Sequence, residues 1–197
     1  ASARRLREEG LHHGVLPLLD AILEQPLGER FITLALQATD QRVNEGKPVS
    51  PAFLFAALIW HQVLKLWTQN QEQDMRPLPA FHEAMEDVIQ TQVENLAIPR
   101  RYTATMREIW SMQPRFLQRA GSRPFRLLEN PKFRAGYDFL LLRCESGELD
   151  KEIGLWWEKF QSANAETREQ MLIRDEAPPR KRRRRRPKKT TPAAAAD

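Results

Sequence analysis

Residues 98–143 read IPRRYTATMREIWSMQPRFLQRAGSRPFRLLENPKFRAGYDFLLLR and combine a basic pattern with the apolar positions of a helical core. They hold ten Lys and Arg against three Asp and Glu, whereas the rest of residues 1–179 holds twelve basic and twenty-two acidic residues. A local charge of +7 therefore lies in surroundings of −10. A second basic segment, residues 180–189, has nine Lys and Arg in ten positions. This distribution is more informative than the net charge of +5.

A single helix over residues 100–119 would divide this segment into two faces. At about 100° per residue, one arc collects five arginines: Arg100, Arg101, Arg107, Arg115 and Arg119. The complementary arc collects the large apolar side chains Tyr102, Met106, Ile109, Trp110, Met112, Phe116 and Leu117. We therefore expect a helix that buries its apolar face and exposes its arginines.

The arginines on this face allow two interpretations. Guanidinium groups bind phosphates through paired hydrogen bonds and stack on bases, which is typical of a nucleic-acid surface. The alternative is a solvated face that is partly neutralised by an acidic neighbouring helix. Tyr102 is a candidate for base stacking. Most of the five tryptophans lie at apolar positions instead, so we expect them in the core.

The rest of the chain has helical spacing of apolar residues and no sustained period-two alternation, which predicts an all-α fold. We predict a single irregular helical domain, residues 1–176, with about seven to eight helices, followed by a disordered basic tail, residues 177–197. Caps, glycines and prolines place helices at residues 11–25, 28–46, 52–70, 79–96, 100–119, 131–145, 148–161 and 165–174, with a short helical turn after Gly121 and a loop over residues 68–79.

Cysteine content and hydropathy bear on location. The single cysteine, Cys144, excludes an internal disulfide and fits a reducing compartment, so we expect a cytoplasmic protein. The longest apolar run, PAFLFAALIW at residues 51–60, has half the length of a membrane-spanning helix, so we expect no span. The chain does not begin with Met, and we expect it to be a piece of a longer protein.

Candidate catalytic groups are few. The four histidines do not have the spacing of metal ligands, and no glycine-rich phosphate loop is present. Glu72 and Asp74 lie in a glutamine-rich loop, while the adjacent Glu86 and Asp87 diverge on a helix. We therefore expect no catalytic residue, metal site or cofactor within this chain.

Several segments together resemble a known family. PAFLFAALIW, LAIPRRYTATMREIW, RPFRLLENPKFRAGYDFLLLR and the terminal basic run are similar, in this order, to the C-terminal half of bacterial poly(A) polymerases. These enzymes are class II nucleotidyltransferases, as are the tRNA CCA-adding enzymes. The likeness covers most of residues 11–189, and PKFRAGYDFLLLR is its most specific part. The arginine-rich end favours the poly(A) enzymes over the CCA-adding ones.

The resemblance implies a division of labour. In the family a head holds two Mg²⁺ ions and transfers adenylate from ATP, a neck selects the nucleotide, and the helical body and tail hold RNA. The Gly-Ser and Asp-x-Asp pattern of the head and the acidic, arginine-bearing motif of the neck are absent here. The resemblance therefore implies that ATP and Mg²⁺ bind to the missing head and neck, against which this chain packs, and that this chain binds RNA 3′ ends with little sequence preference.

The RNA-binding residues that we predict come from two sources. The resemblance implies Arg100, Arg101, Arg107, Arg123, Arg126, Lys132 and Arg134. The charge pattern adds Arg115, Arg119 and the tail residues Arg180, Lys181, Arg182, Arg183, Arg184, Arg185, Arg186, Lys188 and Lys189.

Other functions remain compatible with the sequence. The arginine face would also suit a protein-interaction module that docks an acidic partner from RNA turnover, such as a nuclease or helicase. The chain would also fit the corresponding part of a tRNA CCA-adding enzyme. The basic run by itself is typical of nuclear targeting signals and of segments that bind anionic lipid.

Overall fold

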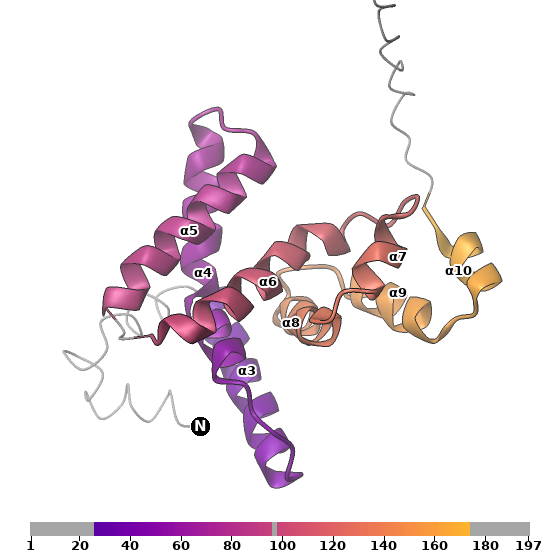
Figure 1. Cartoon of the computed structure of the whole chain (residues 1–197), viewed down its shortest axis with the longest axis horizontal. Coiled ribbons are helices and arrows are strands. Elements are labelled where there is room, and N and C mark those ends of the chain that lie inside the picture. Colours follow the sequence, from indigo (N-terminus) through magenta and orange to yellow (C-terminus); the bar gives the residue numbers. More distant parts are fainter. Residues whose placement is uncertain (1–25, 96–97, 174–197) are drawn as a thin grey trace, which may run out of the picture.

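The computed structural model describes residues 26–95 and 98–173, and this part of the chain contains only α-helices (Figure 1). The eight helices are α3 (Pro26–Asn44), α4 (Pro51–Glu72), α5 (Pro77–Asn95), α6 (Arg100–Phe116), α7 (Arg123–Leu128), α8 (Phe133–Ser146), α9 (Lys151–Ser162) and α10 (Ala165–Met171). The predicted all-α fold is confirmed. The expected helix at residues 11–25 and the basic tail lie outside the described residues.

The buried side chains form two clusters that share helices α6 and α8. The first contains Trp60 and Phe81 from α4 and α5 together with Trp110 of α6. The second contains Phe116, at the end of α6, with Trp157 and Phe160 of α9. In Figure 1, α3, α4 and α5 lie at one end and α7, α9 and α10 at the other, with α6 running between them. Helix α6 is therefore held in place by both clusters.

Two predicted helix starts are confirmed in atomic detail. The Ser50 hydroxyl accepts a hydrogen bond from the Phe53 amide at 3.4 Å, and Pro51 occupies the first turn of α4. Asn164 caps α10 in the same way, with its side chain accepting from the Thr167 amide at 2.8 Å. In both places a polar side chain accepts a hydrogen bond from a main-chain amide that has no partner within the helix.

The predicted loop over residues 68–79 is much shorter than expected. Helix α4 continues to Glu72 and α5 begins at Pro77. Glutamine and glutamate are good helix formers, so the polar run extends the helix. The buried Asn70 side chain also joins the two helices by donating to the Ala80 carbonyl at 3.3 Å. The chain reverses through Asp74, whose φ of 62° is left-handed.

The predicted helix over residues 100–119 also ends early, at Phe116. Leu117 is 47% exposed, although the helical pattern placed it on the buried face. Arg119 therefore lies beyond α6, and the helical wheel does not describe its direction. Its carbonyl accepts a hydrogen bond from the Ile173 amide at 3.0 Å, which ties the end of this region to the residues that follow α10.

A buried ion pair lies where α4, α6 and α8 meet. Arg143 is 5% exposed and donates to Glu148 from both Nε and Nη2 at 2.7 Å. Its Nη1 reaches Gln113 Oε1 at 3.3 Å, and its guanidinium lies 4.9 Å from the ring centroid of Trp60. Trp60 Nε1 donates in turn to Glu148 at 2.9 Å. We call Trp60, Gln113, Arg143 and Glu148 the Arg143 centre.

No helix in the described part of the chain combines the length and apolar character needed to span a lipid bilayer.

Candidate nucleic-acid interface

Helix α6 has the two faces that its sequence predicts. Met106, Ile109, Trp110, Met112 and Phe116 are fully buried. Arg100, Arg101 and Arg115 are exposed, and Arg107 is half-buried. We call Arg100, Arg101, Arg107 and Arg115 the α6 arginine face. Core packing on the opposite side fixes the orientation of α6, and Trp110 Nε1 also donates to the Ala56 carbonyl of α4 at 3.2 Å.

Arg107 is already engaged by a carboxylate. Its Nε and Nη2 donate to the two oxygens of Glu86 on α5, at 2.7 and 2.8 Å. Its Nη1 also reaches the Thr103 hydroxyl at 3.1 Å. The hydrogen bond from Arg107 lowers the pKa of Glu86 below its ordinary value of 4.5 and, reciprocally, raises the pKa of Arg107. A phosphate that binds Arg107 must compete with this carboxylate.

Two more of the predicted residues form ion pairs. Arg119 Nη1 donates to both oxygens of Glu152 on α9, at 2.7 and 2.8 Å, and its guanidinium lies 5.6 Å from the Trp156 ring centroid. Its side chain is only 17% exposed. Arg134 pairs with Asp138 at 3.0 Å one turn further along α8 and remains largely exposed.

The predicted stacking residue, Tyr102, contacts Phe55 and Arg101. Its ring centroid is 5.9 Å from that of Phe55 on α4. The Arg101 guanidinium lies over the Tyr102 ring, 4.8 Å from its centroid, and donates to the Tyr102 hydroxyl at 3.0 Å. Arg101 is exposed and its guanidinium lies over one face of the partly buried Tyr102 ring.

Four predicted residues are exposed and make no side-chain hydrogen bond or ion pair with any residue that the structure describes: Arg100, Arg115, Arg126 and Lys132. Arg100 and Arg115 belong to α6, Arg126 to α7, and Lys132 precedes α8. Arg123, the first residue of α7, is also exposed. Arg100, Arg115, Arg126 and Lys132 hold their charge without a carboxylate partner among the described residues, which suits them to an external anion.

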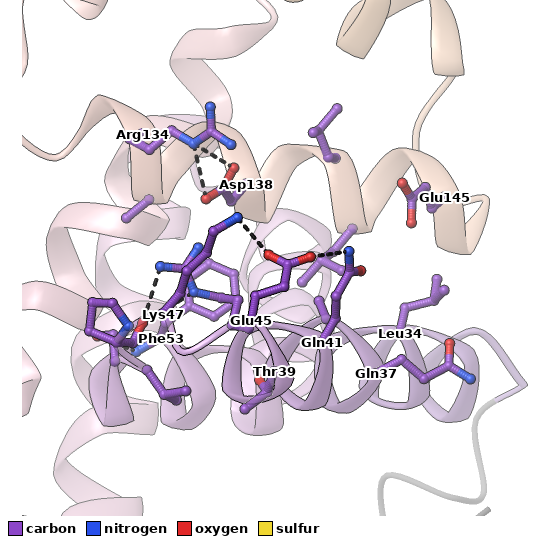
Figure 2. A pocket seen from close by; sticks show the side chains of 18 of the residues that line it. Leu34, Gln37, Thr39, Gln41, Glu45, Lys47, Phe53, Arg134, Asp138 and Glu145 are labelled. Atoms are coloured by element: carbon purple, nitrogen blue, oxygen red, sulfur yellow. Dashed lines mark hydrogen bonds and ion pairs between the residues drawn. The ribbon is translucent and has the colours of Figure 1, made fainter.

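Lys132 and Arg134 also line a groove of about 670 Å³ between α3 and α8 (Figure 2). Leu34, Phe53 and Leu141 supply apolar surface there. Figure 2 shows the Arg134–Asp138 pair opposite a Lys47–Glu45 pair on the α3 side. Burial raises the pKa of Asp138 above its ordinary value of 3.8, against the opposing effect of Arg134. The groove thus carries both signs of charge.

Residues 73–190 match the protein family described as "Polymerase A arginine-rich C-terminus". The chain belongs to this family. It is 40% identical over 174 residues to poly(A) polymerase I of Haemophilus influenzae, covering 86% of this chain and 38% of that protein. For poly(A) polymerase I of Escherichia coli O6:H1 the identity is 42% over 155 residues, covering 76% and 33%. The chain thus spans about two fifths or less of these relatives, and the resemblance to bacterial poly(A) polymerases is confirmed.

The family match includes the α6 arginine face, α7, α8 and the basic residues 180–189. The tail residues Arg180, Lys181, Arg182, Arg183, Arg184, Arg185, Arg186, Lys188 and Lys189 lie outside the described residues. Within the described part, no three His, Cys, Asp or Glu side chains are placed to hold a metal ion.

Sequence reasoning did not identify the carboxylates Glu86 and Glu152 as partners of Arg107 and Arg119. Both acids lie on amphipathic helices far along the chain from their partners, and helical periodicity gives no distance between helices. The sequence does contain an indication of the Arg143 centre. Arg143 lies within the apolar run FLLLRC, and a charged residue is rarely buried unless it is paired.

Proposed function

We propose that this chain is the RNA-holding C-terminal region of a polynucleotide adenylyltransferase that adds poly(A) to RNA 3′ ends from ATP. Its cations hold the RNA backbone with little sequence preference. The transfer chemistry, with ATP and Mg²⁺, belongs to a head and neck outside this chain, against which the chain packs. The enzyme acts in the cytoplasm, alongside other proteins of RNA turnover.

The observation that carries this proposal is the set of exposed cations Arg100, Arg115 and Arg126 on α6 and α7, which have no hydrogen-bond or ion-pair partner among the described residues. A merely soluble surface usually intersperses both signs of charge, whereas α6 itself contains one acidic residue, Glu108, and one further acid, Glu86 of α5, pairs with Arg107. Arginine suits phosphate because its planar fork makes two parallel hydrogen bonds. The names of the relatives, which contain "Poly(A) polymerase", make RNA the appropriate polyanion to test.

The test is a salt titration of the full chain with a fluorescent 24-nucleotide oligoadenylate. If about six phosphates of the single strand are neutralised, the affinity falls about three hundredfold between 50 and 200 mM salt. The double variant Arg100→Gln/Arg115→Gln is expected to bind more weakly at every salt concentration and with a shallower salt slope. A salt-independent affinity of the unaltered chain would overturn the proposal.

A matched control distinguishes a local surface from total charge. Arg30 on α3 and Lys65 on α4 are exposed and make no ion pair with described residues, so Arg30→Gln/Lys65→Gln removes the same charge elsewhere. We expect this control to retain nearly the affinity of the unaltered chain. An equal loss in both variants would mean that overall charge alone attracts the RNA.

The ion pairs of Arg107 and Arg119 favour a second candidate, the docking of an acidic protein segment. Under this alternative, polyglutamate would compete for the α6 arginine face as well as RNA of equal charge does. Weak competition by polyglutamate and strong competition by RNA would support the first candidate.

A further inference from the structure

The walls of the groove between α3 and α8 are held in place by the core and by a main-chain contact (Figure 2). The ring of Phe139 on α8 packs edge-on against Phe31 of α3 and Phe53 of α4, with centroids 5.3 and 5.8 Å apart. Arg42 donates from Nε and Nη2 to the Pro48 carbonyl at 3.2 and 3.1 Å, which ties the segment after α3 to that helix. The groove, of about 670 Å³, therefore has walls built by the chain's own packing and the size typical of a small-molecule site.

One end of the groove carries an excess of positive charge. Four cations line it against two carboxylates: Arg42, Lys47, Lys132 and Arg134 against Glu45 and Asp138. Both carboxylates are paired, one with Lys47 and one with Arg134, and Figure 2 shows the two pairs at the same end. Lys132 makes no side-chain hydrogen bond or ion pair with any residue that the structure describes. This end therefore has two more positive charges than negative ones, which suits a phosphate group.

The other end of the groove offers hydrogen-bonding groups that have no partner among the described residues. Gln37 on α3 and Glu145 on α8 both line the groove, are exposed and make no side-chain hydrogen bond there. Figure 2 places them at the end opposite the Arg134–Asp138 pair. Together they present an amide, which both donates and accepts, and a carboxylate, which accepts.

Apolar side chains line the middle of the groove. Leu141 lies on α8 between Asp138 and Glu145, and Leu34 and Ala38 line the groove from α3. A ligand that matches this order has an anionic group, an apolar body and a polar far edge. A nucleotide has this order, because its phosphate is followed by the flat faces of the base and then by the hydrogen-bonding edge of the base. A lipid phosphate has no polar group at its far end and would leave the amide and the carboxylate unused.

We propose that this groove binds one adenosine 5′-phosphate group, either as a free nucleotide or as a unit of RNA. The phosphate binds beside Lys132, and the base lies on Leu141. The Gln37 amide makes the paired hydrogen bonds to adenine that side-chain amides make, and the Glu145 carboxylate accepts the remaining hydrogen of the adenine amino group. The RNA form rests on the proposed function, and it reads the base at one position only, while the phosphate contacts elsewhere carry no sequence preference.

The first test measures binding of adenosine 5′-monophosphate to the full chain by isothermal titration calorimetry. Inosine 5′-monophosphate has an oxygen in place of the amino group and faces the Glu145 carboxylate with an acceptor, so it should bind about tenfold more weakly. Adenosine lacks the phosphate and should also bind more weakly. The groove variant Gln37→Ala/Glu145→Ala should lose about tenfold in affinity for adenosine 5′-monophosphate.

A matched control removes the same two types of side chain elsewhere. Gln69 on α4 and Glu83 on α5 are exposed and make no side-chain hydrogen bond with described residues. The control variant Gln69→Ala/Glu83→Ala should bind adenosine 5′-monophosphate as the unaltered chain does. Alanine is the best helix former, so both variants should keep the fold.

The second test asks whether the bound group is a unit of RNA. Uracil has no exocyclic amino group, so the unaltered chain should bind the 24-nucleotide oligoadenylate about tenfold more tightly than an oligouridylate of equal length. The groove variant should lose this preference, while its affinity for oligouridylate should equal that of the control variant. If adenosine 5′-monophosphate binds as expected but the two RNAs bind equally, the groove takes the free nucleotide.

The outcomes separate this inference from the proposed function. The inference is overturned if neither adenosine 5′-monophosphate nor oligoadenylate is preferred over its partner ligand, or if the control variant loses as much affinity as the groove variant. It is also overturned if sedimentation shows a dimer that the groove variant weakens, because a second copy would then occupy the groove. If the unaltered chain binds neither RNA, the proposed function fails, and the free nucleotide still tests the groove.

Discussion

The Arg143 centre and the α6 arginine face use the same side chain in opposite ways. Arg143 is 5% exposed, and its guanidinium is surrounded by Glu148, Gln113 and Trp60. Arg115 is exposed and has no ion pair with any described residue. Both belong to the basic segment 98–143, on helices that pack together. The number of arginines in a segment therefore overstates the charge offered to a ligand, because some guanidinium groups hold the fold together.

The largest expected effect on the free energy of unfolding comes from replacing the buried Arg143. Arg143→Met leaves the Glu148 carboxylate, 11% exposed, without its counter-charge. Removing one partner of a buried ion pair typically lowers the free energy of unfolding by about 3–5 kcal/mol. Arg115→Met should change it by less than about 0.5 kcal/mol, since its site is an exposed surface. Urea denaturation of the two variants measures both values.

A double variant distinguishes charge from packing. Arg143→Met/Glu148→Gln removes both charges, so it should be more stable than Arg143→Met alone. If the double variant is as unstable as the single one, the loss comes from altered packing around Trp60 and not from an unpaired carboxylate.

A smaller effect concerns His61, which is 7% exposed beside the Arg143 centre. Burial lowers its pKa below the ordinary value of 6.5; nearby Glu148 opposes this shift and Arg143 reinforces it. The unfolded chain therefore takes up a proton near pH 6.5 that the folded chain resists. This makes the free energy of unfolding fall as the pH decreases from 7 to 5.

The measurement compares urea denaturation at pH 7 and pH 5 for the unaltered chain and for His61→Leu. The loss of stability at pH 5 should be smaller in His61→Leu, because the leucine does not titrate. Exposed His82 provides the control, and His82→Asn should keep the pH dependence of the unaltered chain. Equal pH dependence in all three proteins would contradict the assignment to His61.

Local signals in the sequence predicted the helices well. Ser50 with Pro51 and the cap at Asn164 place two helix starts correctly, because each signal and its effect lie within four residues. The loop near Asn70 and the end of α6 were mispredicted for the opposite reason. The Asn70 contact with Ala80 joins α4 to α5, and the Arg119 contact with Glu152 joins the segment after α6 to α9. Periodicity within one helix does not predict contacts with other elements.

The candidate site was predictable in the same partial way. The helical pattern of α6 correctly predicts that Arg100 and Arg115 are exposed while Trp110 and Met106 are buried. This works because burying the apolar face directs the opposite, arginine-bearing face toward solvent. It does not show that Arg107 is bound by Glu86, 21 positions earlier in the chain. Whether the α6 arginine face binds RNA stays a prediction.

The smallest expected effect comes from removing the carboxylate partner of Arg107, which leaves this arginine without an ion pair, as Arg115 is among the described residues. Glu86→Gln removes the carboxylate that holds Arg107 but keeps the size of the side chain. The side chains of the pair are 37% and 53% exposed, so the free energy of unfolding should change by less than about 1 kcal/mol. The freed guanidinium should add one phosphate contact, which steepens the dependence of log affinity on log salt by about 0.7 for single-stranded RNA.

Asp87→Asn provides the control for this last change, because Asp87 is the adjacent exposed carboxylate and forms no ion pair with described residues. Both substitutions remove one negative charge from α5, so long-range attraction of RNA rises equally in the two variants. Only Glu86→Gln frees Arg107, so only that variant should steepen the salt dependence. If the two slopes are equal, Arg107 remains unavailable to RNA, and the α6 arginine face is reduced to Arg100, Arg101 and Arg115.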